Sequence, residues 1–225
     1  MVKVYIFNVS ERRKKTESAP IWGGSPFAYF EEKARTERGK RREITLAEGE
    51  ILHFIFTDGY KKEEPDGIFE KGEYGKLKFT NYNEKAPKID FSIAHTKDTL
   101  VVALSDGAPV GIDVEPFERE LSDGVEGRFL GGFMPRILPF SDELYEVKKK
   151  EANLSLFEIT PQKKPPNEAA PLTRWTAMEA LVKMSGEGLS ACKKANALLD
   201  KTELSSFYYC GKNGEKYILT LAVST

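Results

Sequence analysis

The stretch SDGAPVGIDVE, residues 105–115, divides the chain into two halves. Its first part carries Asp106, Gly107 and Pro109, residue types that form turns and interrupt helices and strands. Its second part, VGIDVE, alternates in the period of two that is typical of a β-strand. We therefore predict two subdomains, residues 1–106 and residues 107–225, that meet at this turn.

The composition is that of an ordinary globular protein, with 31% charged and 40% hydrophobic residues among 225. A formal net charge of -1 gives no overall argument for nucleic acid, so an anion site has to be a local cluster. Cys192 and Cys210 are too few for a disulfide framework, which favours a reducing cytoplasm. No apolar run approaches the roughly 20 residues that span a bilayer. We expect a cytoplasmic monomer with neither nucleic acid nor a membrane as its partner.

The first half is predicted to begin with a strand at residues 2–9, followed by one or two helices over residues 27–56. A charged, glycine-rich and proline-containing loop is expected at residues 58–78. Two strands, KIDFSIAHT (88–96) and TLVVALS (99–105), then flank a turn at Lys97-Asp98.

The second half begins with VGIDVE and ends with a predicted hairpin of SSFYYC (205–210) and KYILTLAV (216–223). Helices are predicted at residues 141–153 and from residue 174, and a loop at residues 159–171. YILTLAV at the end of this half resembles TLVVALS at the end of the first, which suggests a duplicated αβ unit.

The segment FLGGFMPRILPF, residues 129–140, has apolar side chains interrupted by two glycines and two prolines. No regular helix or strand can bury them on one face. Either they fill the core or they form an exposed patch flanked by Arg128 and Arg136.

Two carboxylates share one face of VGIDVE. Asp113 and Glu115 lie about 7 Å apart along the strand, beside the space that Gly111 leaves. Carboxylates this close repel each other unless a cation or a proton intervenes. They are either solvent-facing acids on an edge strand or part of a cation site.

The helix RWTAMEALVKMSGEGLS, residues 174–190, places Glu179 and Lys183 just beyond the border of its apolar arc. They are either a solvated surface pair or groups that line a cleft. In a cleft, Glu179 adds a third carboxylate to Asp113 and Glu115, and oxygen-only ligands suit Mg²⁺.

Three weaker signals point to an anionic ligand. His95 lies at the end of a predicted strand, and Lys76 is a cation next to a flexible glycine, Gly75. Basic residues also crowd residues 35–42, where arginines could hold a phosphate. Each signal alone is more consistent with an ordinary surface or structural role.

The order of these features resembles the 4′-phosphopantetheinyl transferases of the surfactin-synthetase-activating (Sfp) type. The resemblance covers residues 35–225 and rests on GIDVE (111–115) and WTAMEALVKMSGEGLS (175–190). It implies an α/β (α+β) fold of two pseudo-symmetric subdomains, each a small, mostly antiparallel sheet with helices, and a ligand cleft between them. Ala94 and Leu77 depart from the family pattern, which has serine before the histidine and proline after the lysine.

The resemblance also implies roles for individual residues. The Mg²⁺ ligands it implies are Asp113, Glu115 and Glu179. It implies that Glu179 and Lys183 are catalytic. The contacts it implies with coenzyme A are Lys183, Lys76 and His95, to which we add Arg41 and Arg42 from the basic cluster.

The implied reaction transfers 4′-phosphopantetheine from coenzyme A to a serine of an apo acyl or peptidyl carrier protein, in the presence of Mg²⁺. Adenosine 3′,5′-bisphosphate is released. The alternative is a non-catalytic relative that binds coenzyme A or a carrier protein, since fold does not fix function. The carrier could belong to fatty-acid, polyketide or nonribosomal peptide synthesis. The resemblance implies that it docks on an exposed apolar patch at residues 129–140 with a basic rim at Arg128 and Arg136.

Overall fold

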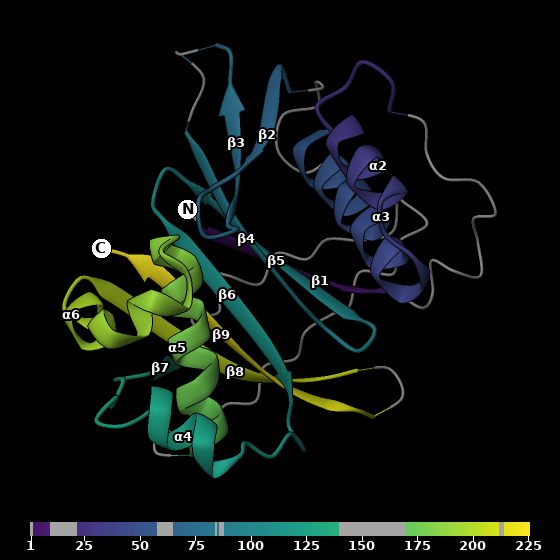
Figure 1. The fold of residues 1–225 in the computed structure, drawn as a ribbon. Coiled ribbons are helices and arrows are strands. Elements are labelled where there is room, and N and C mark those ends of the chain that lie inside the picture. Colours follow the sequence, from purple (N-terminus) through teal and green to yellow (C-terminus); the bar gives the residue numbers. More distant parts are fainter. Residues whose placement is uncertain are drawn as a thin grey trace.

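A computed structural model describes residues 2–9, 22–57, 65–83, 85, 88–139, 170–211 and 214–225. The first half contains β1 (Val2–Asn8), α2 (Ala28–Arg35), α3 (Gly39–Phe54), β2 (Gly67–Lys71), β3 (Leu77–Asn81), β4 (Ile89–Thr96) and β5 (Thr99–Asp106). The second contains β6 (Val110–Pro116), α4 (Asp123–Phe129), β7 (Leu138–Pro139), α5 (Pro171–Ser185), η3 (Gly188–Lys194), α6 (Ala195–Leu199), β8 (Thr202–Cys210) and β9 (Lys216–Ser224) (Figure 1).

The sheets of the two halves share one strand order. The first sheet runs β1-β5-β4 and the second runs β6-β9-β8, with β7 added in parallel beside β8. In each half the opening strand pairs antiparallel with the closing strand, which also pairs with the strand before it. The predicted α+β fold with small antiparallel sheets is confirmed. YILTLAV and TLVVALS, whose resemblance suggested a duplication, form the central strands β9 and β5.

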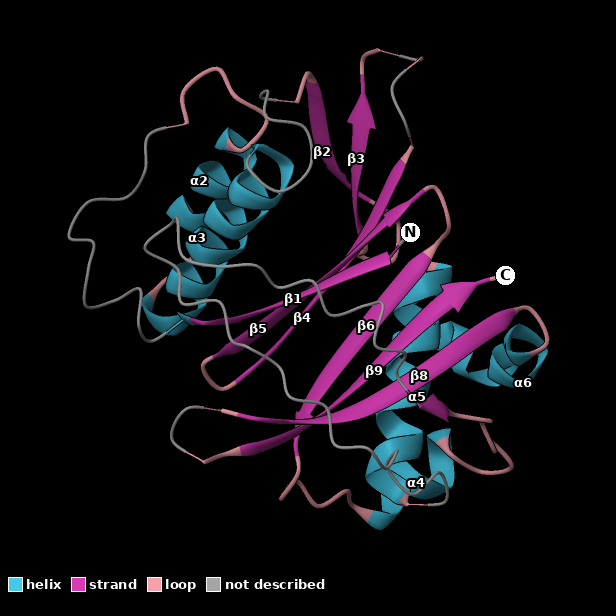
Figure 2. Cartoon of the chain, turned by 180° about the vertical axis from the view of Figure 1, so that it is seen from behind, coloured by secondary structure: helices cyan, strands magenta, loops and turns pink. Residues whose placement is uncertain are grey.

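The two sheets meet where β6 lies beside β4 (Figure 2). Two β4 side chains satisfy backbone N–H groups of β6: Asp90 accepts from Val110 N at 2.7 Å, and Ser92 Oγ accepts from Ile112 N at 3.1 Å. These bonds matter because an unpaired buried N–H is costly. They join the halves without a continuous backbone ladder.

Each sheet buries one face against helices and the other against the second sheet. Phe7, Ile51 and Leu100 belong to the cluster between the first sheet and α2 and α3. Met178 and Leu181 of α5 belong to the cluster on the second sheet. A third cluster packs β1, β4 and β5 against β6, β8 and β9. Since burying one large apolar side chain contributes roughly 1.5–3 kcal/mol, this third cluster is enough to hold the halves together.

The expected loop at residues 58–78 was wrong for its second part, which contains most of a β-hairpin. Strands β2 and β3 pair antiparallel, and Gly75 in the connection has a φ of +97°. Phe69 of β2 is buried against other aromatic rings of the first core. The charged composition concealed the hairpin, because Phe69 is the one large side chain that β2 buries.

Segment 129–139 fills the core, so the expected exposed patch was wrong for most of it. Leu130, Phe133 and Ile137 are buried against the α5 cluster, and among the apolar side chains that the structure describes in this segment only Met134 is strongly exposed, at 63%. Arg174 of α5 donates from Nε to the Phe133 carbonyl at 2.8 Å and also bonds the Leu130 carbonyl. Arg174 thus supplies hydrogen bonds to backbone carbonyls of an irregular segment that does not form a regular helix or strand. Phe140, the predicted helix at 141–153 and all but the end of the predicted loop at 159–171 lie outside the described residues.

Candidate active site

Gly111, Asp113 and Glu115 lie on the face of β6 that looks toward α5. Asp113 and Glu115 are only 5% and 8% exposed. In the first half the same face of the opening strand β1 carries Tyr5 and Phe7, which belong to the helix-covered core. The helix-facing side of β6 therefore carries carboxylates, whereas the corresponding side of β1 in the first half carries aromatic side chains. Such burial is unfavourable for charge, and it rules out the alternative that these acids face solvent.

Gly111 lets α5 lie directly on β6. A Cβ at this position would overlap the backbone of Ala180 and Met184. This approach holds one side of α5 over the two acids. The helix then ends in the left-handed conformation at Gly186, and a second left-handed glycine, Gly188, follows, with φ of +71° and +64°.

Gly111→Ala is expected to lower the free energy of unfolding by about 1–3 kcal/mol, because the helix has to move off the strand. Chemical denaturation measures this loss. Gly127→Ala is the matched control, since an added Cβ there meets nothing within 4 Å and the position is helical. Its stability should stay the same or rise. A Gly111→Ala protein as stable as the wild type would contradict the close approach of α5.

Lys183 reaches across from α5 to Asp113 on β6. Its Nζ lies 2.7 Å from Asp113 Oδ1. The other oxygen, Oδ2, is buried and has no hydrogen-bond partner among the described residues. Asp113 therefore keeps one oxygen available for a further ligand.

Burial and mutual repulsion raise the pKa values of the other two carboxyls. Burial, and then the charge of Asp113, raise the pKa of Glu115 to about 7, against the attraction of Arg119 and Lys183. Burial, and then Asp113, also raise the pKa of Glu179, against the attraction of Lys183 and Arg119. The three acids thus share one electrostatic environment in which full ionisation needs a cation.

Arg119, which follows β6, is a second cation at these acids. Its guanidinium forms an ion pair with Glu115 and lies 5.8 Å from the centre of the Trp175 ring. Trp175 is on α5, so this side chain bridges the two elements that carry the carboxylates. The sequence analysis did not single out Arg119, although a cation four residues after an acid is a recognisable local signal.

The donor set fits Mg²⁺ in its chemistry, because it offers only carboxylate oxygens and one of them has no partner. Among the described residues, no three carboxylate, imidazole or thiol side chains are arranged as a ready-made metal site. Instead, Lys183 and Arg119 neutralise Asp113 and Glu115. Binding a metal at these acids would require the two cations to shift.

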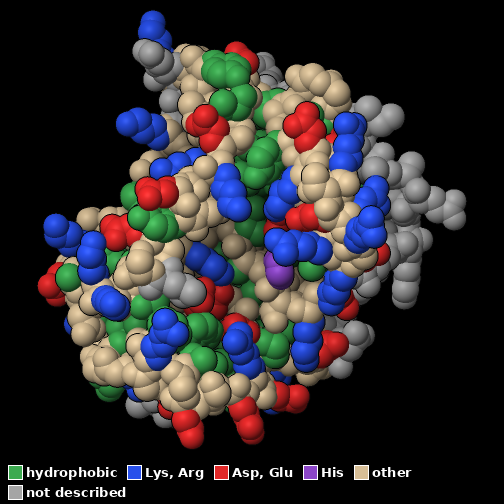
Figure 3. Space-filling model, viewed as in Figure 1, with side chains coloured by type: hydrophobic (Ala, Val, Ile, Leu, Met, Phe, Trp, Pro, Cys, Tyr) green, Lys and Arg blue, Asp and Glu red, His purple; other side chains and the backbone are tan. Residues whose placement is uncertain are grey.

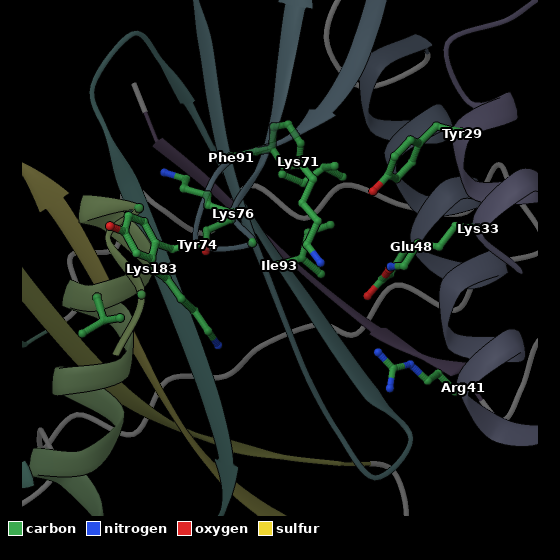
Figure 4. A pocket seen from close by; sticks show the side chains of 16 residues that line it. Tyr29, Lys33, Arg41, Glu48, Lys71, Tyr74, Lys76, Phe91, Ile93 and Lys183 are labelled. Atoms are coloured by element: carbon green, nitrogen blue, oxygen red, sulfur yellow. The ribbon is translucent and has the colours of Figure 1, made fainter. Parts of the chain in front are cut away.

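A cavity of about 400 Å³ opens beside Lys183, between the two halves. Its walls come from α2 and α3, the β2–β3 hairpin, β4 and the C-terminal end of α5 (Figure 4). Glu48 is its only acidic lining residue among the described residues. Its cations are Lys33, Arg41, Lys71, Lys76 and Lys183. Figure 3 shows Lys and Arg side chains gathered around this hollow. The local charge is thus strongly positive although the chain has a net charge of -1.

The structure brings together only some of the residues predicted to contact coenzyme A. Lys183, Lys76 and Arg41 line the cavity. His95, near the end of β4, and Arg42, on α3, are exposed and do not line it. Their roles stay predictions.

The structure also reveals cavity residues that the sequence analysis missed. Lys33 of α2 and Lys71 of β2 both line the cavity. For Lys71 a signal existed: it follows Gly67 and Phe69 on the inward face of a strand, and a cation there points into the protein or a cavity.

This α+β protein of two similar halves thus has a cation-lined cavity beside two buried acids and one half-buried acid, an arrangement whose cations suit a phosphorylated ligand. No known protein-family profile matches the chain. Over 193 residues it is 26% identical to the 4′-phosphopantetheinyl transferase psf-1 of Bacillus pumilus, covering 84% of this chain and 71% of that protein. This similarity supports the phosphopantetheinyl transferase superfamily. Within the described residues, no helix has the length and apolar character to cross a membrane.

Proposed function

We propose that this chain is a 4′-phosphopantetheinyl transferase of the surfactin-synthetase-activating type. It transfers the phosphopantetheine half of coenzyme A to a serine of an apo carrier protein and releases adenosine 3′,5′-bisphosphate. The observation that carries this proposal is the acid group of Asp113 and Glu115, which are buried, and Glu179, which is half-buried, beside a cavity with five cationic side chains. The relative from Bacillus pumilus supports it independently.

The cations of the cavity suit coenzyme A, which carries a pyrophosphate and a 3′-phosphate. Lys183 stands at the border between the cavity and the acids, so it can hold the pyrophosphate next to them. Asp113, Glu115 and Glu179 would hold Mg²⁺, which when bound neutralises negative charge that builds up on the phosphates.

In the proposed reaction the serine oxygen attacks the phosphorus next to pantetheine, and the bond from that phosphorus to the bridging oxygen breaks. Glu179 accepts the serine proton, directly or through water. Lys183 stabilises the negative charge on the departing bisphosphate.

Mass spectrometry of apo carrier proteins tests the proposal. With coenzyme A and Mg²⁺, a carrier from fatty-acid, polyketide or nonribosomal peptide synthesis should gain the mass of one phosphopantetheine. The same mixture with a chelator is the control and should show no gain. Absence of modification on carriers from all three pathways would rule out the transferase.

The alternative is a relative that binds coenzyme A or a carrier without transfer. The three acids beside the cavity, two of them buried, disfavour it, because they repel phosphates and a protein that only binds the ligand does not need them. Calorimetric binding of coenzyme A without modification of any carrier would favour this alternative.

A further inference from the structure

The ammonium of Lys76 has already used its hydrogen-bonding capacity. Nζ donates to Asp90 Oδ2 at 2.6 Å, to the Val110 carbonyl at 3.0 Å and to the Met184 carbonyl at 3.4 Å. A lysine ammonium has three donors, so none remains for a phosphate. The side chain is only 10% exposed, and in Figure 4 it points away from Lys71.

These three bonds join elements that are far apart in the sequence. Lys76 begins from the β2–β3 hairpin, Asp90 belongs to β4, Val110 to β6, and Met184 to the last turn of α5. Asp90 Oδ2 also accepts from Val110 N at 2.7 Å. The Met184 carbonyl is near the helix end, where carbonyls lack an intrahelical partner. Lys76 therefore ties the cavity wall to the strand and helix that carry the acids.

Lys71 is a second lysine of the same hairpin, and it is free of such ties. It ends β2, is exposed and lines the cavity. Figure 4 shows its side chain extending into the cavity between Lys183 on one wall and Lys33 on the other. Within the described ranges no ion pair or side-chain hydrogen bond involves Lys71, whereas Lys33 and Arg41 pair with Glu48 and Glu37.

We infer that Lys71, and not Lys76, is the hairpin lysine that contacts a phosphate of the ligand, and that Lys76 is a positioning residue. The inference deepens the proposed function and rests on it. A phosphate is expected to bind most favourably to the ammonium of Lys71, because no carboxylate of the described residues forms an ion pair with it and other cations surround it. A tied ammonium would first have to break its bonds to Asp90 and two carbonyls.

Calorimetry with coenzyme A separates the two lysines. Lys71→Met should weaken binding about ten- to a hundredfold, the loss expected for a charge-assisted hydrogen bond, while the melting temperature stays unchanged. The affinity of this variant should also depend less on NaCl concentration than that of the wild type. Lys78→Met is the matched control, because Lys78 is an exposed lysine of the same hairpin that does not line the cavity. Its affinity should equal that of the wild type.

Thermal unfolding tests the role of Lys76. Lys76→Met should lower the melting temperature by about 5 °C or more, because it leaves Asp90 and two carbonyls without their donor. Asp90→Asn should cause a similar loss, and the double variant should lose much less than the sum of the two.

Two outcomes would overturn the inference. One is wild-type affinity for coenzyme A in Lys71→Met. The other is a tenfold weaker affinity in Lys76→Met at an unchanged melting temperature, which would return the phosphate contact to Lys76. If the wild-type protein itself fails to bind coenzyme A, the proposed function fails, and this inference fails with it.

Discussion

Asp113→Asn is expected to lower the rate of phosphopantetheine transfer by a factor of about 100 or more, and Glu179→Gln to do the same, as loss of charge stabilisation does in other enzymes. Asn keeps the size of Asp113 but removes its charge. Its amide would also place hydrogens toward Lys183, whose ammonium now lies 2.7 Å from Asp113 Oδ1. Glu179→Gln removes the proposed acceptor of the serine proton.

The measurement is the initial rate of mass gain on an apo carrier at saturating coenzyme A and Mg²⁺. Glu203→Gln, an exposed acid on β8, is the control for a loss of one negative charge and should keep the wild-type rate. Both site variants should remain folded, which circular dichroism and thermal unfolding can check. A rate within a few-fold of the wild type in Asp113→Asn would remove this carboxylate from the chemistry.

Glu115→Gln is expected to abolish a large pH dependence of stability in the metal-free protein. The pKa of Glu115 is about 7 in the folded protein, whereas an ordinary glutamate has a pKa of 4.5. Between these two pH values the protein therefore takes up a proton when it folds. The free energy of unfolding should therefore fall as pH rises through this window. The loss is on the order of 3 kcal/mol for one group with such a shift.

Chemical denaturation in a chelator at pH 5 and pH 8 measures the effect. The difference in free energy of unfolding, Glu115→Gln minus wild type, should be more positive at pH 8 than at pH 5. For Glu203→Gln this difference should be the same at both pH values. Added Mg²⁺ should stabilise the wild type at pH 8, because a bound cation lowers the cost of the ionised carboxyl, and should stabilise Glu115→Gln much less. A difference between Glu115→Gln and the wild type that is the same at both pH values would contradict this assignment.

The local pattern of the chain was sufficient for β1, β4, β5, β6, β8 and β9 and for the face on which the acids lie, but it missed β2 and β3. Strand alternation places Asp113 and Glu115 on the same face whatever surrounds them. The turn at residues 106–109, which glycine and proline predict, lies between β5 and β6. Helical periodicity likewise placed Glu179 and Lys183 at the border of the apolar arc of α5. Periodicity is a property of neighbouring residues, so it needs no knowledge of the fold.

Contacts between distant segments were decided only by tertiary packing. Lys71 and Lys76 lie five residues apart on one hairpin, and nothing in their immediate sequence says that Asp90 and α5 engage the second and leave the first in the cavity. The same holds for Leu130 and Phe133, which enter the core because Arg174 satisfies their carbonyls. The raised pKa of Glu115 depends on burial beneath α5 and on the charge of Asp113. The burial of a side chain and the charges around it depend on all the elements that folding brings near it. A local sequence pattern contains no information about these distant elements.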